Sequence, residues 1–295
     1  METTDSKAID SETAAARERS DAERGAALLP TLPAKPDLTP EAATVLEEVP
    51  GYLGVPFVSP IFPALANWPD YLVPAWNAFK PVLGSPAFSE AAAALRVPAE
   101  LLPAPDPSLR TGADDADTDL IRRYTITFHQ LLPTVLLLTS CWYGGLTVGG
   151  RAARPEAPDP GPRGIRPGTV NVTPDGTSPT EELAHVYEEI RATHDHPRVL
   201  SFYRALGNWP AFMTGAWDHL GPVARDAGYA AARRRLLTTA TGLATTLPVP
   251  VIDTSAAEEA RAILALFRTR LIPALFLDTA AVLALLGETD PIASA

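Results

Sequence analysis

The sequence contains one unusual motif twice, as LANWPDYLVPAW at residues 65–76 and as LGNWPAFMTGAW at residues 206–217. Aligning Trp68 with Trp209 sets an offset of 141 residues. The same offset pairs further identical residues on both sides of the motif, among them Glu41 with Glu182, Glu48 with Glu189, Pro56 with Pro197 and Val82 with Val223. One register held over this distance predicts an internal duplication. Two long copies differ from the many short units of a solenoid, so we expect a pseudo-dimer.

The duplication continues past the motif, because an offset of 140 pairs Pro133 with Pro273 and Leu137 with Leu277. Between the copies lies RAARPEAPDPGPRGIRPGTVNVTPDGTSPT, in which proline and glycine are too dense for a helix or a sheet. The predicted organisation is therefore a mobile N-terminal extension at 1–36, helical repeat 1 at 37–150, a Pro/Gly-rich linker at 151–180 and helical repeat 2 at 181–290.

Both copies have the pattern of helices. TPEAATVLEEV and SPTEELAHVYEEI each place a capping threonine before acidic residues and apolar residues at helical spacing. Alanine-rich segments and long apolar segments follow in each copy, and few stretches alternate in the manner of strands. The sequence predicts an all-α fold, a tandem helical repeat that forms a pseudo-dimer joined by the Pro-rich linker.

The Asn-Trp-Pro motif suits the start of a helix. We expect Asn67 to cap the helix that follows and Pro69 to occupy its first turn, where no N–H is needed. Trp68 and Trp76 lie eight residues apart, so both rings fall near one helix face. The tryptophans are therefore expected to be core anchors that set the angle between successive helices.

Composition narrows the class of partner. The chain of 295 residues is 46 % hydrophobic, and its formal net charge of −11 argues against nucleic acid. The single Cys141 and the charged N-terminus, which lacks an apolar leader segment, predict a cytoplasmic location. A small-molecule substrate is the expected partner, and a homodimer is left open.

One uncharged stretch, residues 130–150, approaches the length of a membrane span. It contains Pro133, Gly144 and Gly145, which suit a buried helix that ends and turns, and its later counterpart carries Asp278. We therefore expect no membrane segment.

The doubled motif also indicates a family. Two helical copies joined by a proline-rich linker, each with a Val-Pro or His-Pro approach, then Trp-Pro and Ala-Trp, resemble the group I 2-haloacid dehalogenases, also called halocarboxylic acid dehydrogenases. The resemblance runs from about Pro40 to Leu286. It implies an active site in a channel between the copies, where an aspartate activates the water that displaces halide from a 2-haloacid, with no metal or organic cofactor.

The resemblance places that aspartate after a serine, at the start of the short helix that leads into the second Trp-Pro. Ser201 fits the serine, but the next residue is Phe202, and the first copy has Ile61 at this position. A phenyl ring cannot accept a proton, so dehalogenation by this route is doubtful. Tyr203 and Arg204 follow, and the planar fork of arginine suits a carboxylate. These five residues are the predicted substrate-binding residues.

Two other groups are candidates for proton transfer. Asp278 lies in an apolar helix, where its pKa is expected to be raised, and His129 lies on the apolar closing helix of the first copy. For both, a hydrogen-bonded core residue is the competing interpretation. THDHP at residues 193–197 lacks a clear third ligand, so no metal site is expected.

Three functional hypotheses remain open at this point. The first is a haloacid dehalogenase-family hydrolase with an altered site. The second is a repurposed cofactor-free cyclase, isomerase or lyase that acts on a larger apolar metabolite in the channel between the repeats. The third is a non-catalytic ligand-binding protein.

Overall fold

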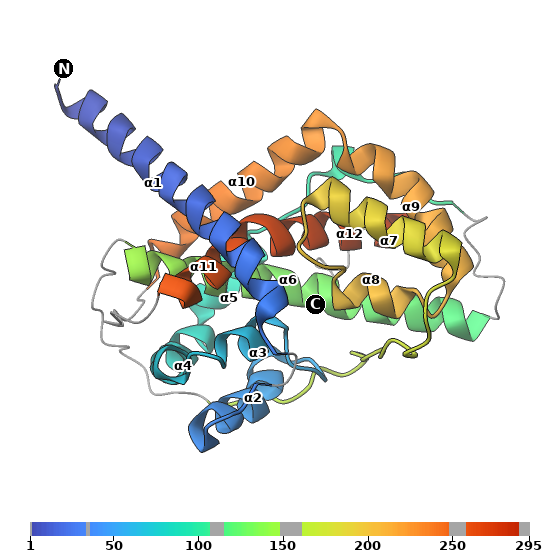
Figure 1. Cartoon of the computed structure of the whole chain (residues 1–295), viewed down its shortest axis with the longest axis horizontal. Helices are drawn as coiled ribbons and strands as arrows, with labels where there is room; N and C mark the ends of the chain where they lie inside the picture. The colour runs from blue at the N-terminus through green and yellow to red at the C-terminus, as the bar shows by residue number, and fades with distance from the viewer. Residues whose placement is uncertain (1, 34–35, 107–114, 148–160, 248–257, 289–295) are drawn as a thin grey trace.

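The computed structural model of the chain describes residues 2–33, 36–106, 115–147, 161–247 and 258–288. Within these ranges all regular secondary structure is helical and no strand occurs, which confirms the all-α prediction (Figure 1). The helices are α1 (Glu2–Leu28), α2 (Pro40–Leu53), α3 (Ile61–Leu65), α4 (Pro69–Leu83), α5 (Pro86–Ala93), α6 (Asp115–Thr147), α7 (Glu181–His194), α8 (Ser201–Leu206), α9 (Pro210–Ala224), α10 (Ala227–Ala244), α11 (Glu258–Leu266) and α12 (Ile272–Leu285). Three shorter helical segments accompany them, namely η1 (Leu29–Thr31), η2 (Ala99–Leu101) and η3 (Phe267–Leu271).

The Trp-Pro motifs begin helices α4 and α9, each of 15 residues with proline at its first position. The residue before each proline has nearly the same backbone conformation, with φ −126° and ψ 72° at Trp68 and φ −121° and ψ 76° at Trp209. Asn67 does not cap α4, contrary to expectation. Its side-chain amide donates instead to the carbonyl of Ala64 at 2.9 Å, and so terminates the preceding helix α3.

The second tryptophan of each motif secures its helix to the helix that opens the same half of the chain. The indole N–H of Trp76 donates to Glu48 of α2 at 2.8 Å, and that of Trp217 donates to Glu189 of α7 at 2.8 Å. Both indoles are buried, as expected of core anchors. Trp68 is only partly buried, and its indole N–H donates to Glu259 of α11 at 3.1 Å. The two tryptophans of the first motif therefore bind to different helices.

The long helix α6 joins the two halves of the molecule. Figure 1 shows α2, α3 and α4 toward one end of α6, α7, α8 and α9 toward the other, and α12 along its length. Near its C-terminal end, Trp142 packs edge to face on Phe62 and Tyr71. Near its start, Tyr124 stacks on Phe202 of α8 at a ring-centroid distance of 5.7 Å. One helix therefore contributes to the core of both halves.

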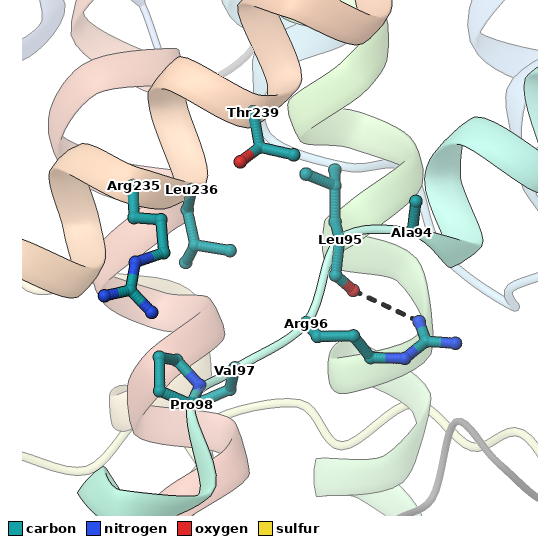
Figure 2. Close-up of a pocket in the computed structure, with 8 residues that line it drawn as sticks. All are labelled: Ala94, Leu95, Arg96, Val97, Pro98, Arg235, Leu236 and Thr239. Carbon is teal, nitrogen blue, oxygen red and sulfur yellow. Dashed lines mark hydrogen bonds between the residues drawn. The ribbon is translucent and has the colours of Figure 1, made fainter.

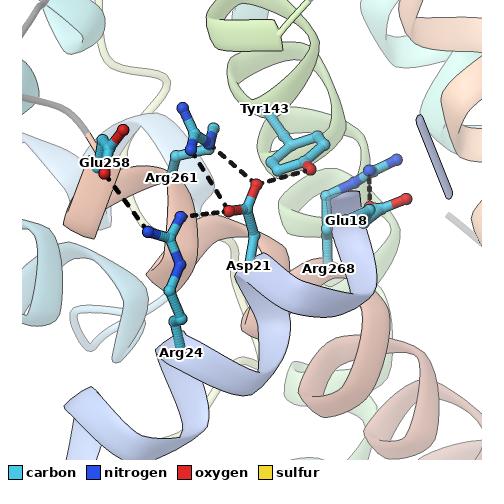
Figure 3. Close-up of polar contacts among 7 residues, drawn as sticks. All are labelled: Glu18, Asp21, Arg24, Tyr143, Glu258, Arg261 and Arg268. Atoms are coloured by element: carbon cyan, nitrogen blue, oxygen red, sulfur yellow. Dashed lines mark hydrogen bonds and ion pairs between the residues drawn. The ribbon is translucent and has the colours of Figure 1, made fainter. Parts of the chain in front are cut away.

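Helix α1 is held against α11 by ion pairs. We expected a mobile N-terminal extension, but the second half of α1 packs on the body of the protein (Figure 3). Asp21 is buried, accepts from Arg261 at 2.9 Å and from the Tyr143 hydroxyl at 3.1 Å, and pairs with Arg24 at 2.5 Å. Arg268 also pairs with Glu18. Acidic residues that are unremarkable in the sequence find their partners only through the tertiary fold.

Gly25 of α1 lies directly against the backbone of α11. A Cβ atom at this position would overlap the carbonyl oxygen of Ala262 and lie 2.8 Å from its carbonyl carbon. Glycine to alanine in a helix normally stabilises by up to about 1 kcal/mol. Gly25→Ala should instead destabilise by about 1–3 kcal/mol, because a helix backbone cannot move aside as a side chain can. Urea unfolding and hydrogen exchange of α1 measure this change.

Gly242 of α10 is the matched control, because none of the described atoms lies within 4 Å of a Cβ built there. Gly242→Ala should raise the free energy of unfolding by up to about 1 kcal/mol. A stabilising Gly25→Ala substitution would show that α1 does not dock as described.

The described part of the linker, residues 161–180, is extended and runs across the surface. Arg166 donates its backbone N–H to Gly54 at 3.0 Å, and Val170 donates to Thr127 of α6 at 3.0 Å. Further along, the backbone N–H of Asp175 donates to the side-chain Oδ1 of Asn208 at 3.0 Å. Across the described ranges, no helix is long and apolar enough to span a bilayer.

Candidate functional site

A pocket of about 320 Å³ lies where the two halves of the chain meet. Its walls come from η1 and the residues after it, the loop at 57–60, α3, α6, the segment 198–204, η3 and α12. Most of the lining is apolar, with leucine, valine, proline and phenylalanine side chains. The polar lining residues are Ser59, Arg198, Ser201 and Arg204, and among the described lining residues there is no carboxylate or imidazole.

The segment 198–204 supplies three of those four polar residues. Ser201 and Arg204 are one helical turn apart on α8, so they share a face, and Arg198 precedes them in the loop. Partial burial lowers the pKa of Arg198, and the nearby charge of Arg204 lowers it further. Within the described residues neither guanidinium has a hydrogen-bond acceptor or an acidic partner. The pocket wall therefore carries two neighbouring positive charges.

Phe202 is not a lining residue of this pocket, although it lies between Ser201 and Arg204, which line it. Its ring is fully buried, stacks on Tyr124 and lies 5.2 Å from the ring of Phe128, both on α6. Ile61, at the corresponding position of α3, is also fully buried and outside the lining. Of the five predicted substrate-binding residues, the structure thus places Ser201 and Arg204 at the pocket and Ile61, Phe202 and Tyr203 behind it.

Asp278 is the centre of a buried polar network. Its carboxylate accepts hydrogen bonds from the Tyr203 hydroxyl at 2.8 Å and the Tyr229 hydroxyl at 2.6 Å, and it contacts His194 Nε2 at 2.9 Å. Burial alone would raise the pKa of Asp278, but the charge of His194 and these hydrogen bonds outweigh it and lower the pKa. The expected raised pKa is therefore wrong, because the sequence does not reveal the three partners.

The network does not reach the pocket, since none of its members is a lining residue. Asp278 is almost completely buried, and so is His194. Burial first, and then the negative charge of Asp278, raise the pKa of Tyr203 and of Tyr229 well above the usual range. The tyrosines therefore remain neutral donors at neutral pH, and the arrangement holds α7, α8, α10 and α12 together.

His129, the second candidate for proton transfer, also lies outside the pocket. Its Nδ1 is 3.0 Å from the Thr279 hydroxyl, and its ring packs on Phe276 at 4.8 Å. It therefore connects α6 to α12 in the core. The described residues contain no cluster of three or more side chains able to hold a metal ion, the THDHP segment included.

His196 lies beside this network and has an unusual environment. Burial, and then the charges of His194 and Arg233, lower its pKa to about 3. Between about pH 6.5 and 3 the unfolded chain binds a proton here and the folded chain does not, so stability falls as the pH falls through this range. The slope is about 1.4 kcal/mol per pH unit.

The variant His196→Val should therefore lose about 2 kcal/mol less stability than the original chain between pH 6.5 and pH 5. Urea unfolding at both pH values measures the difference. His185 of α7 is the control, because its side chain is 76 % exposed. The pH dependence of the His185→Val variant is the comparison, and equal pH dependence in all three proteins would refute the assignment to His196.

A second crevice, of about 250 Å³, lies between the segment at 94–98 and α10 (Figure 2). Arg96 and Arg235 are on its walls, and Figure 2 shows their guanidinium groups on opposite sides of it. Arg96 donates to the carbonyl of Leu95 at 3.2 Å. The two guanidinium groups do not converge, so substitutions in this crevice are suitable controls for substitutions in the pocket beside α8.

The fold and the pocket together define an all-helical protein with a largely apolar pocket between the two halves of the chain. The chain belongs to the halocarboxylic acid dehydrogenase DehI family, whose model matches residues 56–203. It is 30 % identical over 223 residues to a configuration-inverting 2-haloacid dehalogenase of Alcaligenes xylosoxydans xylosoxydans, covering 72 % of this chain and 75 % of that protein. It is 26 % identical over 234 residues to an (R)-2-haloacid dehalogenase of Rhizobium sp. (strain NHG3), covering 76 % of this chain and 91 % of that protein.

Solved structures show the same fold. The complex of a D-2-haloacid dehalogenase with L-LA superposes with a TM-score of 0.68 at 20 % identity, covering 84 % of this chain and 93 % of that chain. The complex of a D-2-haloacid dehalogenase mutant with D-2-CPA gives a TM-score of 0.67 at 22 % identity, covering 84 % of this chain and 92 % of that chain. At this level of identity the comparison establishes the fold.

Two polar residues of the pocket, Arg198 and Ser59, are not among the predicted substrate-binding residues. Arg198 follows the His-Pro step of the second copy, and Ser59 precedes the short helix of the first. Both lie just ahead of the positions that the family resemblance singled out. Neither belongs to a helical pattern or motif, so their closeness to those positions is the one signal that the sequence offers.

Proposed function

We propose that this chain is an enzyme of the haloacid dehalogenase family that takes an organic acid into the pocket beside α8. The observation that carries the proposal is the placement of Ser201 and Arg204 on the wall of an otherwise apolar pocket. They lie on the helix where the resemblance puts the reacting residues, and the named relatives are 2-haloacid dehalogenases. We assign the chain to group I of these enzymes.

The proposed reaction differs from that of the relatives in its proton acceptor. Hydrolysis at the α-carbon needs a group that activates water, and such a group contributes about 10²- to 10⁴-fold in rate. Phe202 stands in the aspartate position and is buried against α6. Asp278 and His129 are engaged in the core, outside the lining. Hydrolytic dehalogenation is accordingly a residual activity of this chain.

The size and lining of the pocket favour a second candidate function. At about 320 Å³ the pocket lies at the lower end of the roughly 300–1,000 Å³ range of small-molecule sites, and its lining is mostly apolar. A cyclisation, isomerisation or elimination can be accelerated by positioning alone. The second proposal is thus a repurposed cyclase, isomerase or lyase for a larger apolar metabolite. Binding without turnover of any such compound would instead indicate a ligand-binding protein.

We also propose that the two halves are tandem helical repeats, at 37–150 and 181–290, joined by the linker 151–180 as a pseudo-dimer. Supporting this, α4 and α9 have the same length, begin after a tryptophan of the same conformation, and each make one Trp-to-Glu hydrogen bond of 2.8 Å. The pocket then lies between the repeats, which is where the family resemblance puts the active site.

Filling the pocket tests the proposed function. Ala64 lines the pocket and is 6 % exposed, so Ala64→Phe should place a ring in the space. We expect 2-bromopropionate to raise the melting temperature of the original chain, because a ligand at 100 times its Kd stabilises by about 2.7 kcal/mol. The Ala64→Phe variant should show no such rise.

The control for this experiment is Ala94→Phe, which places the same ring in the second crevice. It should leave the ligand-induced rise unchanged. An equal rise in the Ala64→Phe variant, or none in the original chain, would contradict the proposal.

A further inference from the structure

The pocket combines two features that suit different parts of one ligand. Segment 198–204 gives one wall two arginines and a serine, whereas α6, η1 and α12 give apolar walls through residues such as Leu29, Leu131 and Leu275. A ligand that is polar throughout would leave the apolar walls without partners. A ligand that is apolar throughout would leave the arginines without an anion.

The arginine pair requires an anionic partner of a particular kind. Arg198 and Arg204 are close enough for the charge of one to affect the pKa of the other. In the described part of the chain neither pairs with a carboxylate of the protein, unlike Arg261, Arg268 and Arg270. Two guanidinium groups on the wall of one pocket suit a planar carboxylate, which accepts paired N–H donors better than a spherical anion does.

The apolar part of the pocket exceeds what a halopropionate fills. At about 30 Å³ for each water-sized unit, a pocket of this volume holds roughly ten non-hydrogen atoms. A 2-halopropionate supplies about half of that. The remaining space lies along leucine and valine side chains, which favour a hydrocarbon chain.

We propose that the pocket takes an amphipathic monocarboxylic acid, whose carboxylate binds Arg198 and Arg204 and whose apolar chain of about six to eight carbons fills the space between η1, α6 and α12. This inference rests on the proposed function, because it concerns the same pocket. It adds the class of substrate, a medium-chain acid in place of a short haloacid.

Calorimetric binding to the full chain tests the proposal with three probes, octanoate, butyrate and 1-octanol. Octanoate should bind at least tenfold more tightly than butyrate, which lacks the longer chain. It should also bind at least tenfold more tightly than 1-octanol, which has the same chain without the charge. Butyrate or 1-octanol binding as tightly as octanoate would overturn the proposal.

The double variant Arg198→Leu and Arg204→Leu examines the arginines themselves. It should weaken octanoate binding about tenfold to a hundredfold, the range expected for charge-assisted hydrogen bonds, and should leave 1-octanol binding unchanged. The 1-octanol result verifies that the variant folds with its pocket intact. The control, Arg96→Leu with Arg235→Leu in the second crevice, should bind octanoate as the original chain does. Unchanged octanoate binding in the Arg198 and Arg204 variant would overturn the proposal.

Different results would contradict the proposed function and the medium-chain class of substrate. If 2-bromopropionate binds in a manner that Ala64→Phe abolishes, while octanoate binds no more tightly, the proposed function stands and the medium-chain class is wrong. If 2-bromopropionate gives no melting shift in the original chain, the proposed function itself is wrong, whatever the affinity for octanoate.

Discussion

Replacing Asp278 with leucine should lower the free energy of unfolding by about 3–5 kcal/mol, the range observed when one member of a buried charged network is removed. The substitution leaves His194, Tyr203 and Tyr229 without their shared acceptor in a region that water does not reach. Urea unfolding followed by circular dichroism measures the loss. Asp70→Leu, at an exposed position of α4, should change stability by about 0.5 kcal/mol at most.

The first half of the chain shows what should rescue this variant. The repeat offsets pair the polar members of the network, and His196 beside it, with buried apolar residues of the first half, namely His194 with Leu53, His196 with Val55, Tyr203 with Phe62, Tyr229 with Phe88 and Asp278 with Leu138. Replacing a whole buried polar network with packed apolar residues is often neutral or stabilising. The variant that carries all five first-half residues should therefore recover most of the loss.

Failure of this rescue would be informative. If the five-residue variant is as unstable as Asp278→Leu alone, the two halves do not share one core geometry, and the tandem-repeat proposal is wrong. Recovery would show that the polar network is a specialisation of the second half, which the fold itself does not require.

Local signals in the sequence predicted the helical fold well. Thr39 and Thr180 accept hydrogen bonds from the third residue beyond them, at 3.2 Å and 3.3 Å, as capping residues do. Proline at the start of α4 and α9 fits the first turn of each helix. These features depend on residues a few positions apart, which is why sequence reasoning captures them.

Long-range contacts were beyond such reasoning. Asp278 meets partners from three other helices, at separations of 84, 75 and 49 residues. Asp21 meets Arg261 across 240 residues, so the docking of α1 could not be predicted from its charged sequence. Arg198 lies in a loop without a pattern of its own. The candidate site was therefore predicted only in part, through Ser201 and Arg204.

The activity of this chain toward 2-haloacids should be lower, by the contribution of one general base, than that of a family member that carries the aspartate implied by the resemblance. Water is a weak nucleophile, and the pocket offers it no carboxylate or imidazole among the described lining residues. In the proposed site Arg198, Arg204 and Ser59 bind and orient the acid, so we expect substrate binding to remain intact. The expected defect is thus in turnover, with kcat/KM about 10²- to 10⁴-fold below that of a relative with the aspartate.

The most direct measurement is halide release by the purified full chain from both enantiomers of 2-chloropropionate, with a relative that carries the aspartate assayed alongside. Halide probes report the rate, and the ligand-induced melting shift reports occupancy of the pocket in the same samples. We expect that 2-chloropropionate occupies the pocket and that halide release is about 10²- to 10⁴-fold slower than with the relative. Release within tenfold of the relative would contradict it, because another group would then be activating water in this chain.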